Sequence, residues 1–378
     1  MDLRTKLLDL LAPVRVGDEL LPGARLRGAS DEIGPRLVFE VDGEPLHVEV
    51  APIEAATPAA ATSARLRFAY VGATGAGRAR GLAICRAVAR LATINERAVL
   101  EELARDASAD GDRPARVREL HVERLLEEAW HEGRRFHTLS PYVGCLVGCR
   151  FCYAQSHVAL TRRLAGRAAV PWGSYVDVRV NAAEVLAREL EEQDVRVVKL
   201  CPIVSDPYQA VEARAGVTRA CLEAMARARR PPVPIVLTRC RLVERDAALL
   251  ATLGARVGFS LPTVDDGVRA HFEPRAASIP ERLEALTALR RAGVATFGVV
   301  QPVLPGPLPA LVDALAAHCA SVTLDVLRGV EGAAGDFADP RFAHAASAAW
   351  QAERAAELER ALRERGVPVW RELPPGLP

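Results

Sequence analysis

Three cysteines are spaced so that a single loop could bring their thiolates to one metal centre. The segment SPYVGCLVGCRFCYAQSH contains them in C-x3-C-x2-C order, as Cys145, Cys149 and Cys152. Three thiolates can hold a 4Fe-4S cluster and leave one iron open to a cofactor. A structural zinc ion requires a fourth ligand, for which His157 and Cys201 are the candidates. Unligated buried thiols are the remaining alternative.

Polar side chains that could bind charged groups stand where the predicted strands end. Ser205 and Asp206 follow one predicted strand, Arg239 follows the next, and Ser260 lies at the end of the one after that. The carboxyl ends of parallel strands share one edge of a sheet, so we expect these side chains near the cysteine loop. The alternative for each residue is an ordinary helix cap or turn residue.

The elements that would position these residues form a regular alternation of β-branched runs and amphipathic stretches from residue 136 onward. This pattern predicts six βα units. Strands are predicted at 136–142, 195–201, 233–238, 255–261, 294–300 and 321–326, and helices at 182–192, 217–229, 244–253, 280–291 and 308–318. Six units are fewer than the eight of a closed barrel, so the sequence predicts an α/β fold with an open partial (β/α)6 barrel.

The chain before the first cysteine has a different pattern, which predicts a small N-terminal α+β domain. Residues 36–50 alternate apolar and polar side chains around Asp42-Gly43, as in a β-hairpin. Helices are expected near 79–91 and 115–132. We therefore predict an accessory domain at 1–114, the barrel at 115–330 and a C-terminal helical extension at 331–378, with a long helix near 345–365.

Composition sets limits on the class of protein. The chain has 378 residues and 50% hydrophobic content, which excludes a disordered chain. Lys+Arg 49 against Asp+Glu 48 gives a net charge of +1, so no global positive field indicates nucleic-acid binding. The arginine groups at 134–135, 162–167 and 227–230 are more typical of solvated helix faces. With no apolar run of membrane-spanning length, we expect a cytoplasmic protein without membrane contact.

The cysteine motif, with aromatic Phe151 before its last cysteine and a predicted strand before the loop, resembles the radical S-adenosylmethionine (SAM) superfamily. The resemblance implies that the three cysteines ligate a 4Fe-4S cluster whose open iron chelates the amino and carboxylate groups of SAM. An electron from the cluster would cleave SAM to a 5′-deoxyadenosyl radical that abstracts hydrogen. Phe151 would lie beside the adenine, and a one-electron donor such as a flavodoxin or ferredoxin would reduce the cluster.

The strand-end residues, together with segments 271–274 and 280–286, resemble the spore photoproduct lyase-like branch, also labelled DNA repair photolyase-like. The likeness covers about residues 139–307. It implies that Ser205 and Asp206 meet the amino group of SAM and that Arg239 and Ser260 meet its carboxylate. The branch usually has lysine where this chain has Arg239.

In the lyase, a hydrogen-atom relay is thought to use a cysteine and tyrosines. Tyr153 and Cys201 are the candidates here, although Phe151 replaces one tyrosine and Cys201 precedes Ser205 by four positions rather than two. By strand alternation, Lys199 and Cys201 share a face, and both are candidates for substrate contact if that face lines the barrel.

Three functions follow as hypotheses. The first is a radical SAM enzyme acting on a nucleobase photoproduct in DNA. The second is a radical SAM enzyme that modifies a peptide or small metabolite, which the neutral net charge favours. The third is a zinc-stabilised nucleic-acid-binding protein without catalysis.

Overall fold

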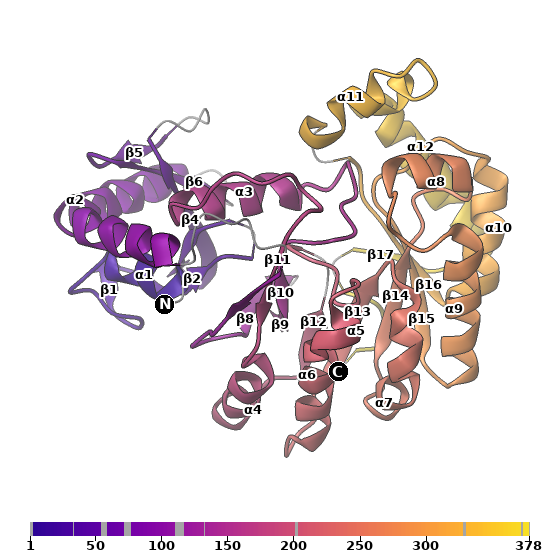
Figure 1. The fold of residues 1–378 in the computed structure, drawn as a ribbon, viewed down its shortest axis with the longest axis horizontal. Helices are drawn as coiled ribbons and strands as arrows, with labels where there is room; N and C mark the ends of the chain where they lie inside the picture. The colour runs from indigo at the N-terminus through magenta and orange to yellow at the C-terminus, as the bar shows by residue number, and fades with distance from the viewer. Residues whose placement is uncertain are drawn as a thin grey trace. The chain divides into compact units, whose positions relative to one another are not determined.

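The computed structural model describes residues 3–32, 34–53, 59–71, 77–109, 117–131, 133–200, 203–327, 330–371 and 373–377. Its contacts divide the chain into two compact units (Figure 1). The first unit comprises Met1–Ala115 and Ser156–Pro171, and the second comprises Arg116–Gln155 and Trp172–Pro378. The segment 156–171, which follows the cysteines in sequence, is therefore part of the N-terminal unit.

The first unit is built on an antiparallel sheet. Within the described residues its order is β1 (Glu19–Leu21), β2 (Ala24–Ser30), β3 (Arg36–Val41), β4 (Glu44–Pro52), β6 (Leu66–Val71) and β5 (Ala61–Thr62). The helices α1 (Leu3–Asp9) and α2 (Gly77–Ala109) pack their apolar side chains against it. Leu164 joins this core from α3 (Ala154–Leu164). The small α+β architecture expected for this region is present.

The hairpin predicted around Asp42-Gly43 is confirmed. Strands β3 and β4 pair from Arg36↔Glu49 to Val41↔Glu44. Asp42 has φ 52° and Gly43 has φ 85°, so both central residues adopt the left-handed conformation that a two-residue type I′ turn requires.

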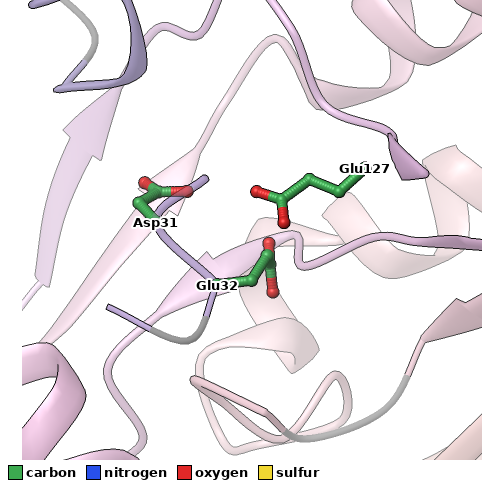
Figure 2. Close-up of side chains that lie close together, drawn as sticks. All are labelled: Asp31, Glu32 and Glu127. Carbon is green, nitrogen blue, oxygen red and sulfur yellow. The ribbon is translucent and has the colours of Figure 1, made fainter. Parts of the chain in front are cut away.

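An arginine on α1 pairs with two acidic side chains just after β2. Arg4 donates from Nε to Asp31 Oδ1 at 2.8 Å and from an Nη atom to Glu32 Oε1 at 3.4 Å. All three side chains are buried, so the ion pairs offset the cost of removing these charges from water. Figure 2 draws Asp31 and Glu32; Glu127, also labelled there, lies on β8 of the second unit.

The second unit contains the partial barrel. Its main sheet, as far as the described chain shows, has the order β17 (Val369–Trp370), β16 (Ser321–Leu324), β15 (Ala295–Val300), β14 (Arg256–Ser260), β13 (Val233–Thr238), β12 (Val197–Leu200), β9 (Arg134–Thr138) and β8 (Glu127–His131). Neighbouring strands are parallel from β9 to β17, and β8 is antiparallel to β9. The six strands predicted from the sequence are confirmed, and with them the α/β partial-barrel fold.

Helices connect these strands. They are α4 (Ala182–Glu192), α5 (Glu212–Ala215), α6 (Val217–Arg227), the 3-10 helix η1 (Arg241–Asp246), α7 (Ala247–Thr252), α8 (Asp266–Phe272), α9 (Ile279–Arg291), α10 (Leu308–His318), η2 (Glu331–Ala333), α11 (Ala334–Phe337), η3 (Ala343–Ala346) and α12 (Ala348–Glu364). Several pack on one face of the sheet, whereas α8, α11 and η3 pack in the cluster that contains the cysteines. Helix and strand side chains such as Leu222, Leu286 and Val257 form one large core.

The opposite face of the sheet has a second, smaller core. Phe136, Val197, Ile235 and Phe297 alternate along their strands with residues of the helix-side core, and Trp370 packs against them. Lys199 belongs to this face, because its Nζ lies 5.0 Å from the centroid of the Phe136 ring. Cys201 lies outside the described residues, so the expectation that it shares this face with Lys199 stays a prediction.

The helix predicted at 115–132 is wrong. In its place the described residues form β7 (Val117–Leu120) and β8. Strand β7 pairs in parallel with β11 (Val176–Arg179), which pairs with β10 (Tyr142–Val143), while β8 pairs with β9. Pairing with distant strands overrides a local helical propensity, which is a weak determinant of structure. In the described part of the chain no helix has the length and apolar character needed to cross a membrane.

Candidate active site

The three predicted cysteines lie together in one apolar cluster of the second unit. Their loop begins after β10 and ends where α3 starts. Cys145 and Cys149 are buried and Cys152 is half-buried, and all three pack in a cluster that also contains Phe151 and Phe272. The loop is thus shielded from water on several sides, as a centre that must exclude solvent requires.

Two glycines allow the loop to fold tightly. Gly144 has φ 86° and Gly148 has φ 61°, a conformation that other residues rarely adopt. A Cβ atom on Gly148 would lie 2.9 Å from Gly173 Cα, and one on Gly144 would lie 2.8 Å from the carbonyl oxygen of Tyr175. Any side chain at either position would therefore displace the loop.

The first half of the loop is fastened to the segment that follows β12. Gly144 donates its backbone N–H to the carbonyl of Val204 at 3.0 Å. The side chain of Gln209, which is 0% exposed, accepts from the Leu146 N–H at 2.7 Å and donates to the Gly144 carbonyl at 3.2 Å. Sequence analysis gave Gln209 no role, because a hydrogen bond across 63 positions leaves no local pattern.

The second half of the loop is fastened to α8 and the residues after it. Arg150 donates its backbone N–H to the Phe272 carbonyl at 2.9 Å. Arg275 donates from Nε to the Leu146 carbonyl at 2.6 Å and from an Nη atom to the Gly173 carbonyl at 2.9 Å. The cysteine loop therefore has its position set by residues from separate βα units.

Burial keeps the metal-free thiols protonated. It raises the pKa of Cys145 to about 12 and also raises the pKa values of Cys149 and Cys152. The Arg239 guanidinium opposes this effect at Cys149 and Cys152. Binding a metal centre would release these protons, and Arg239 is the cation placed to stabilise the resulting thiolates.

The three cysteine sulfurs do not form a group whose members all lie within 4.8 Å of one another, among the residues that the structure describes. Tetrahedral zinc with Zn–S bonds of about 2.3 Å places its sulfur ligands about 3.8 Å apart.

Asp206 fastens the end of β13 to the segment after β12. Among the described residues, its carboxylate accepts hydrogen bonds from Thr238 Oγ1 at 2.7 Å, from the Tyr208 N–H at 2.9 Å and from the Arg239 N–H at 2.8 Å. Burial raises its pKa, although these hydrogen bonds oppose the shift. A carboxylate has about four acceptor positions, so Asp206 retains one. Its neighbour Ser205 is also buried.

Arg239 lies between the cysteines and a buried carboxylate. Its Nε donates to Glu273 Oε1 at 2.6 Å, and its guanidinium carbon is 6.0 Å from the centroid of the Phe151 ring. Within the described residues, neither of its Nη atoms has a hydrogen-bond partner. The guanidinium can therefore bind a further anion through a planar pair of donors.

Glu273 itself is held by a second arginine. Arg282 donates from an Nη atom to Glu273 Oε2 at 2.7 Å, and both residues are 0% exposed. Burial raises the pKa of Glu273, but the two guanidinium groups outweigh it and hold the pKa below its usual value. Glu273 is thus an anion shared by two cations.

Ser260 has a hydroxyl without a hydrogen-bond partner. It lies at the end of β14, is 0% exposed, and its Oγ is among the buried polar atoms left unpaired within the described chain. An unpaired buried hydroxyl costs about 1–3 kcal/mol, so its presence indicates a group that a ligand would satisfy. Arg282 donates to the Ser260 carbonyl at 2.6 Å, which connects this strand end to the arginine pair.

The candidate relay residues are only partly placed. Tyr153 is half-buried, directly after Cys152 and before α3. Cys201 falls outside the described residues. His157, the alternative zinc ligand, belongs to the first unit, and burial lowers its pKa to about 4.

Comparison with known proteins identifies the part of the chain that contains this site. Residues 139–309 match the sequence model of the radical SAM superfamily. The chain is 25% identical over 170 residues to an uncharacterized protein of Methanocaldococcus jannaschii, which covers 45% of this chain and 61% of that protein. It is 30% identical over 175 residues to an uncharacterized protein of Mycobacterium tuberculosis, covering 45% and 50%.

These curated relatives are matched over 61% and 50% of their own lengths. Among solved structures, a cysteine-to-serine variant of spore photoproduct lyase is similar with a TM-score of 0.47 and 18% identity, over 67% of this chain and 81% of that one.

Replacing Gln209 with Met should loosen the cysteine loop while keeping the side chain's shape. Losing two buried hydrogen bonds should lower the free energy of unfolding by about 1–3 kcal/mol. Iron bound after anaerobic reconstitution should then be lost to a chelator about tenfold faster, as when a partner that orients metal ligands is removed.

Gln351→Met is the matched control, because Gln351 is 1% exposed and makes similar backbone hydrogen bonds to Val303 and Ala345. It should lose comparable stability and keep its iron. Equal iron loss in both variants would contradict the role assigned to Gln209.

Proposed function

We propose that this chain, whose residues 139–309 match the radical SAM superfamily, binds a 4Fe-4S cluster through Cys145, Cys149 and Cys152 and cleaves SAM reductively. The family implies an enzyme that uses such a cluster and SAM. The observation that carries the proposal is the Arg239 guanidinium, 6.0 Å from the ring of Phe151, which packs in one cluster with the three cysteines. The Ser260 hydroxyl, unpaired among the described residues, lies at the end of the neighbouring strand β14.

The residues around the cysteines fit this cofactor by their chemistry. Three cysteines can hold a 4Fe-4S cluster and leave one iron open to a further ligand. The Nη atoms of Arg239, which have no hydrogen-bond partner among the described residues, and the Ser260 hydroxyl would bind the SAM carboxylate. The remaining acceptor of Asp206, with Ser205, would bind the amino group, and Phe151 would lie beside the adenine.

When bound, the cluster and SAM supply a 5′-deoxyadenosyl radical for hydrogen abstraction. The residues of the protein would hold the reacting groups in position and exclude water. The loop fastened by Gln209 and Arg275 holds the thiolates, Asp206 fixes the backbone of Arg239, and the apolar cluster around Phe272 excludes water. A one-electron donor such as a flavodoxin or ferredoxin is proposed as the partner that delivers the electron.

The direct test is anaerobic purification followed by iron and sulfide analysis. The wild type should contain about four irons per chain, as expected for a cubane cluster, and should form 5′-deoxyadenosine when dithionite and SAM are added. Cys149→Ala should lose both properties. Cys319→Ala is the control, because Cys319 is a buried thiol of the helix-side core. Zinc in place of iron, without SAM cleavage, would overturn the proposed function.

Ser260→Ala provides a more specific test of how SAM is bound. Because the hydroxyl is buried and unpaired, its removal should leave stability unchanged or slightly increased. SAM affinity should fall about tenfold or more, since a hydrogen bond to a charged group contributes about 1.5–3 kcal/mol. Ser321→Ala, which removes a hydroxyl bonded to Trp370 Nε1 at 3.0 Å, should show the reverse pattern. Unchanged SAM affinity in Ser260→Ala would contradict this assignment.

For the substrate, we propose a nucleobase photoproduct in DNA, with Tyr153, Lys199 and Cys201 as candidates for the hydrogen relay and substrate contact. The support is the similarity of the strand-end residues to the spore photoproduct lyase-like branch. A second candidate, a peptide or small metabolite, is favoured by the pairing of the arginines. Arg227 lies 3.9 Å from Glu223 and Arg230 lies 3.5 Å from Asp194, so part of the positive charge of this cluster is paired within the protein.

Salt dependence separates the two substrate classes. We expect binding of an oligonucleotide that contains a thymine photoproduct to weaken with salt, because each phosphate contact adds about 0.7–0.9 to the slope of log affinity against log salt. Fluorescence anisotropy at several salt concentrations measures this slope. A slope near zero, or no binding, would contradict the DNA substrate and favour the peptide or metabolite.

A further inference from the structure

The buried carboxylate of Glu273 touches both parts of the candidate site. Glu273 Oε1 is 2.6 Å from Arg239 Nε and 3.9 Å from Cys149 Sγ, and Oε2 is 2.7 Å from an Nη atom of Arg282. All of its described side-chain contacts are therefore with two cations and one cysteine. Sequence analysis included Glu273 in the segment 271–274 without giving it a role.

We propose that Glu273 is a positioning residue that aims Arg239 at the SAM carboxylate and, through its own charge, lowers the reduction potential of the cluster held by Cys149. This inference rests on the proposed function. It adds to that function a residue that contacts neither SAM nor iron.

The orientation of the Arg239 guanidinium depends on which of its nitrogen atoms contacts Glu273. Glu273 occupies Nε, and the backbone N–H of Arg239 is fixed by Asp206 at 2.8 Å. Among the described residues the Nη atoms have no hydrogen-bond partner, so they remain donors for a further anion. Without the carboxylate, the long arginine side chain would regain rotamer freedom, and ordering it would oppose SAM binding.

Arg282 keeps the carboxylate in place. It donates from Nε to the Ala277 carbonyl at 2.9 Å and from the other Nη atom to the Ser260 carbonyl at 2.6 Å. Arg282 is thus fixed at three points, and it holds Glu273 Oε2 while Oε1 holds Arg239. A shorter or uncharged side chain at 273 could not bridge both guanidinium groups in this way.

The negative charge of Glu273 is expected to lower the reduction potential of the cluster. With a cluster bound, Cys149 is a thiolate and Glu273 is an anion close to it, so adding an electron to the cluster is less favourable. Cluster potentials respond to net charge, hydrogen bonds to sulfur and burial. Removing the carboxylate charge while keeping Arg239 and Arg282 should therefore shift the potential upward.

The test compares reconstituted wild type with Glu273→Gln and Glu273→Asp by electron paramagnetic resonance. Redox titration gives the cluster potential, and the change in the reduced-cluster spectrum with added SAM gives SAM affinity. Glu273→Gln should bind a full complement of iron, show a higher potential and bind SAM about tenfold more weakly, as for loss of one charge-assisted contact. Glu273→Asp keeps the charge, so its potential should stay near that of the wild type while SAM affinity falls.

Glu212→Gln is the matched control. Glu212 is also 0% exposed and bound by an arginine, with Arg245 Nη2 at 2.6 Å, but it contacts neither Arg239 nor a loop cysteine. It should lose stability without changing potential or SAM affinity.

Wild-type potential and affinity in Glu273→Gln, or equal changes in Glu212→Gln, would overturn the inference. If Glu273→Gln does not fold, the Glu273→Asp variant tests the positioning role instead. Unchanged SAM affinity in Glu273→Asp would overturn that role. A wild-type cluster whose spectrum does not respond to SAM would overturn the proposed function together with the inference. A responsive wild type beside an unaltered Glu273→Gln would overturn the inference alone.

Discussion

The site depends on balancing charge within an apolar interior. Burying an ion costs several kcal/mol unless a partner and further hydrogen bonds offset the lost hydration. The Arg239 guanidinium lowers the pKa values of Cys149 and Cys152 against the opposing effect of burial, so it is the cation that would stabilise thiolates there. Arg239 in turn requires Glu273, and Glu273 is shared with Arg282. Arg239 and the residues paired with it would therefore do two things: they would help to bind the cofactor, and their ion pairs offset the cost of burying their own charges.

The partial barrel supplies several of these groups from successive strands. Asp206 and Gln209 follow β12, Arg239 directly follows β13, and Ser260 ends β14, whereas the cysteine loop follows β10 of the three-stranded sheet. Hydrogen bonds such as those of Asp206 and Gln209 run between these loops rather than within them. The parallel sheet thus brings residues that are distant in sequence to one edge. The hydrogen bonds between the loops then fix the relative positions of these residues.

Sequence patterns predicted the local elements well and the long-range contacts poorly. β13 and α10 occupy the predicted residues 233–238 and 308–318, because buried β-branched runs and amphipathic periodicity are local properties. The helix expected at 115–132 is two strands, since their partners β11 and β9 lie elsewhere in the chain. The cysteines were found from their spacing, whereas Gln209 acts through contacts with residues far along the sequence, which leave no local pattern. Arg282 lay in the resembling segment 280–286, but its contact with Glu273 could not be read from the sequence.

The division of the chain at α3 has an evolutionary consequence. Residues 156–171, a few positions after Cys152, are counted with the N-terminal unit, so that unit consists of two separated stretches of sequence. A recombination event that exchanged residues 1–115 alone would leave Leu164 without the core in which it is buried. Lineages of this protein should therefore inherit the N-terminal unit together with the segment behind the cysteine motif, and the two stretches should diversify in concert rather than as an interchangeable module.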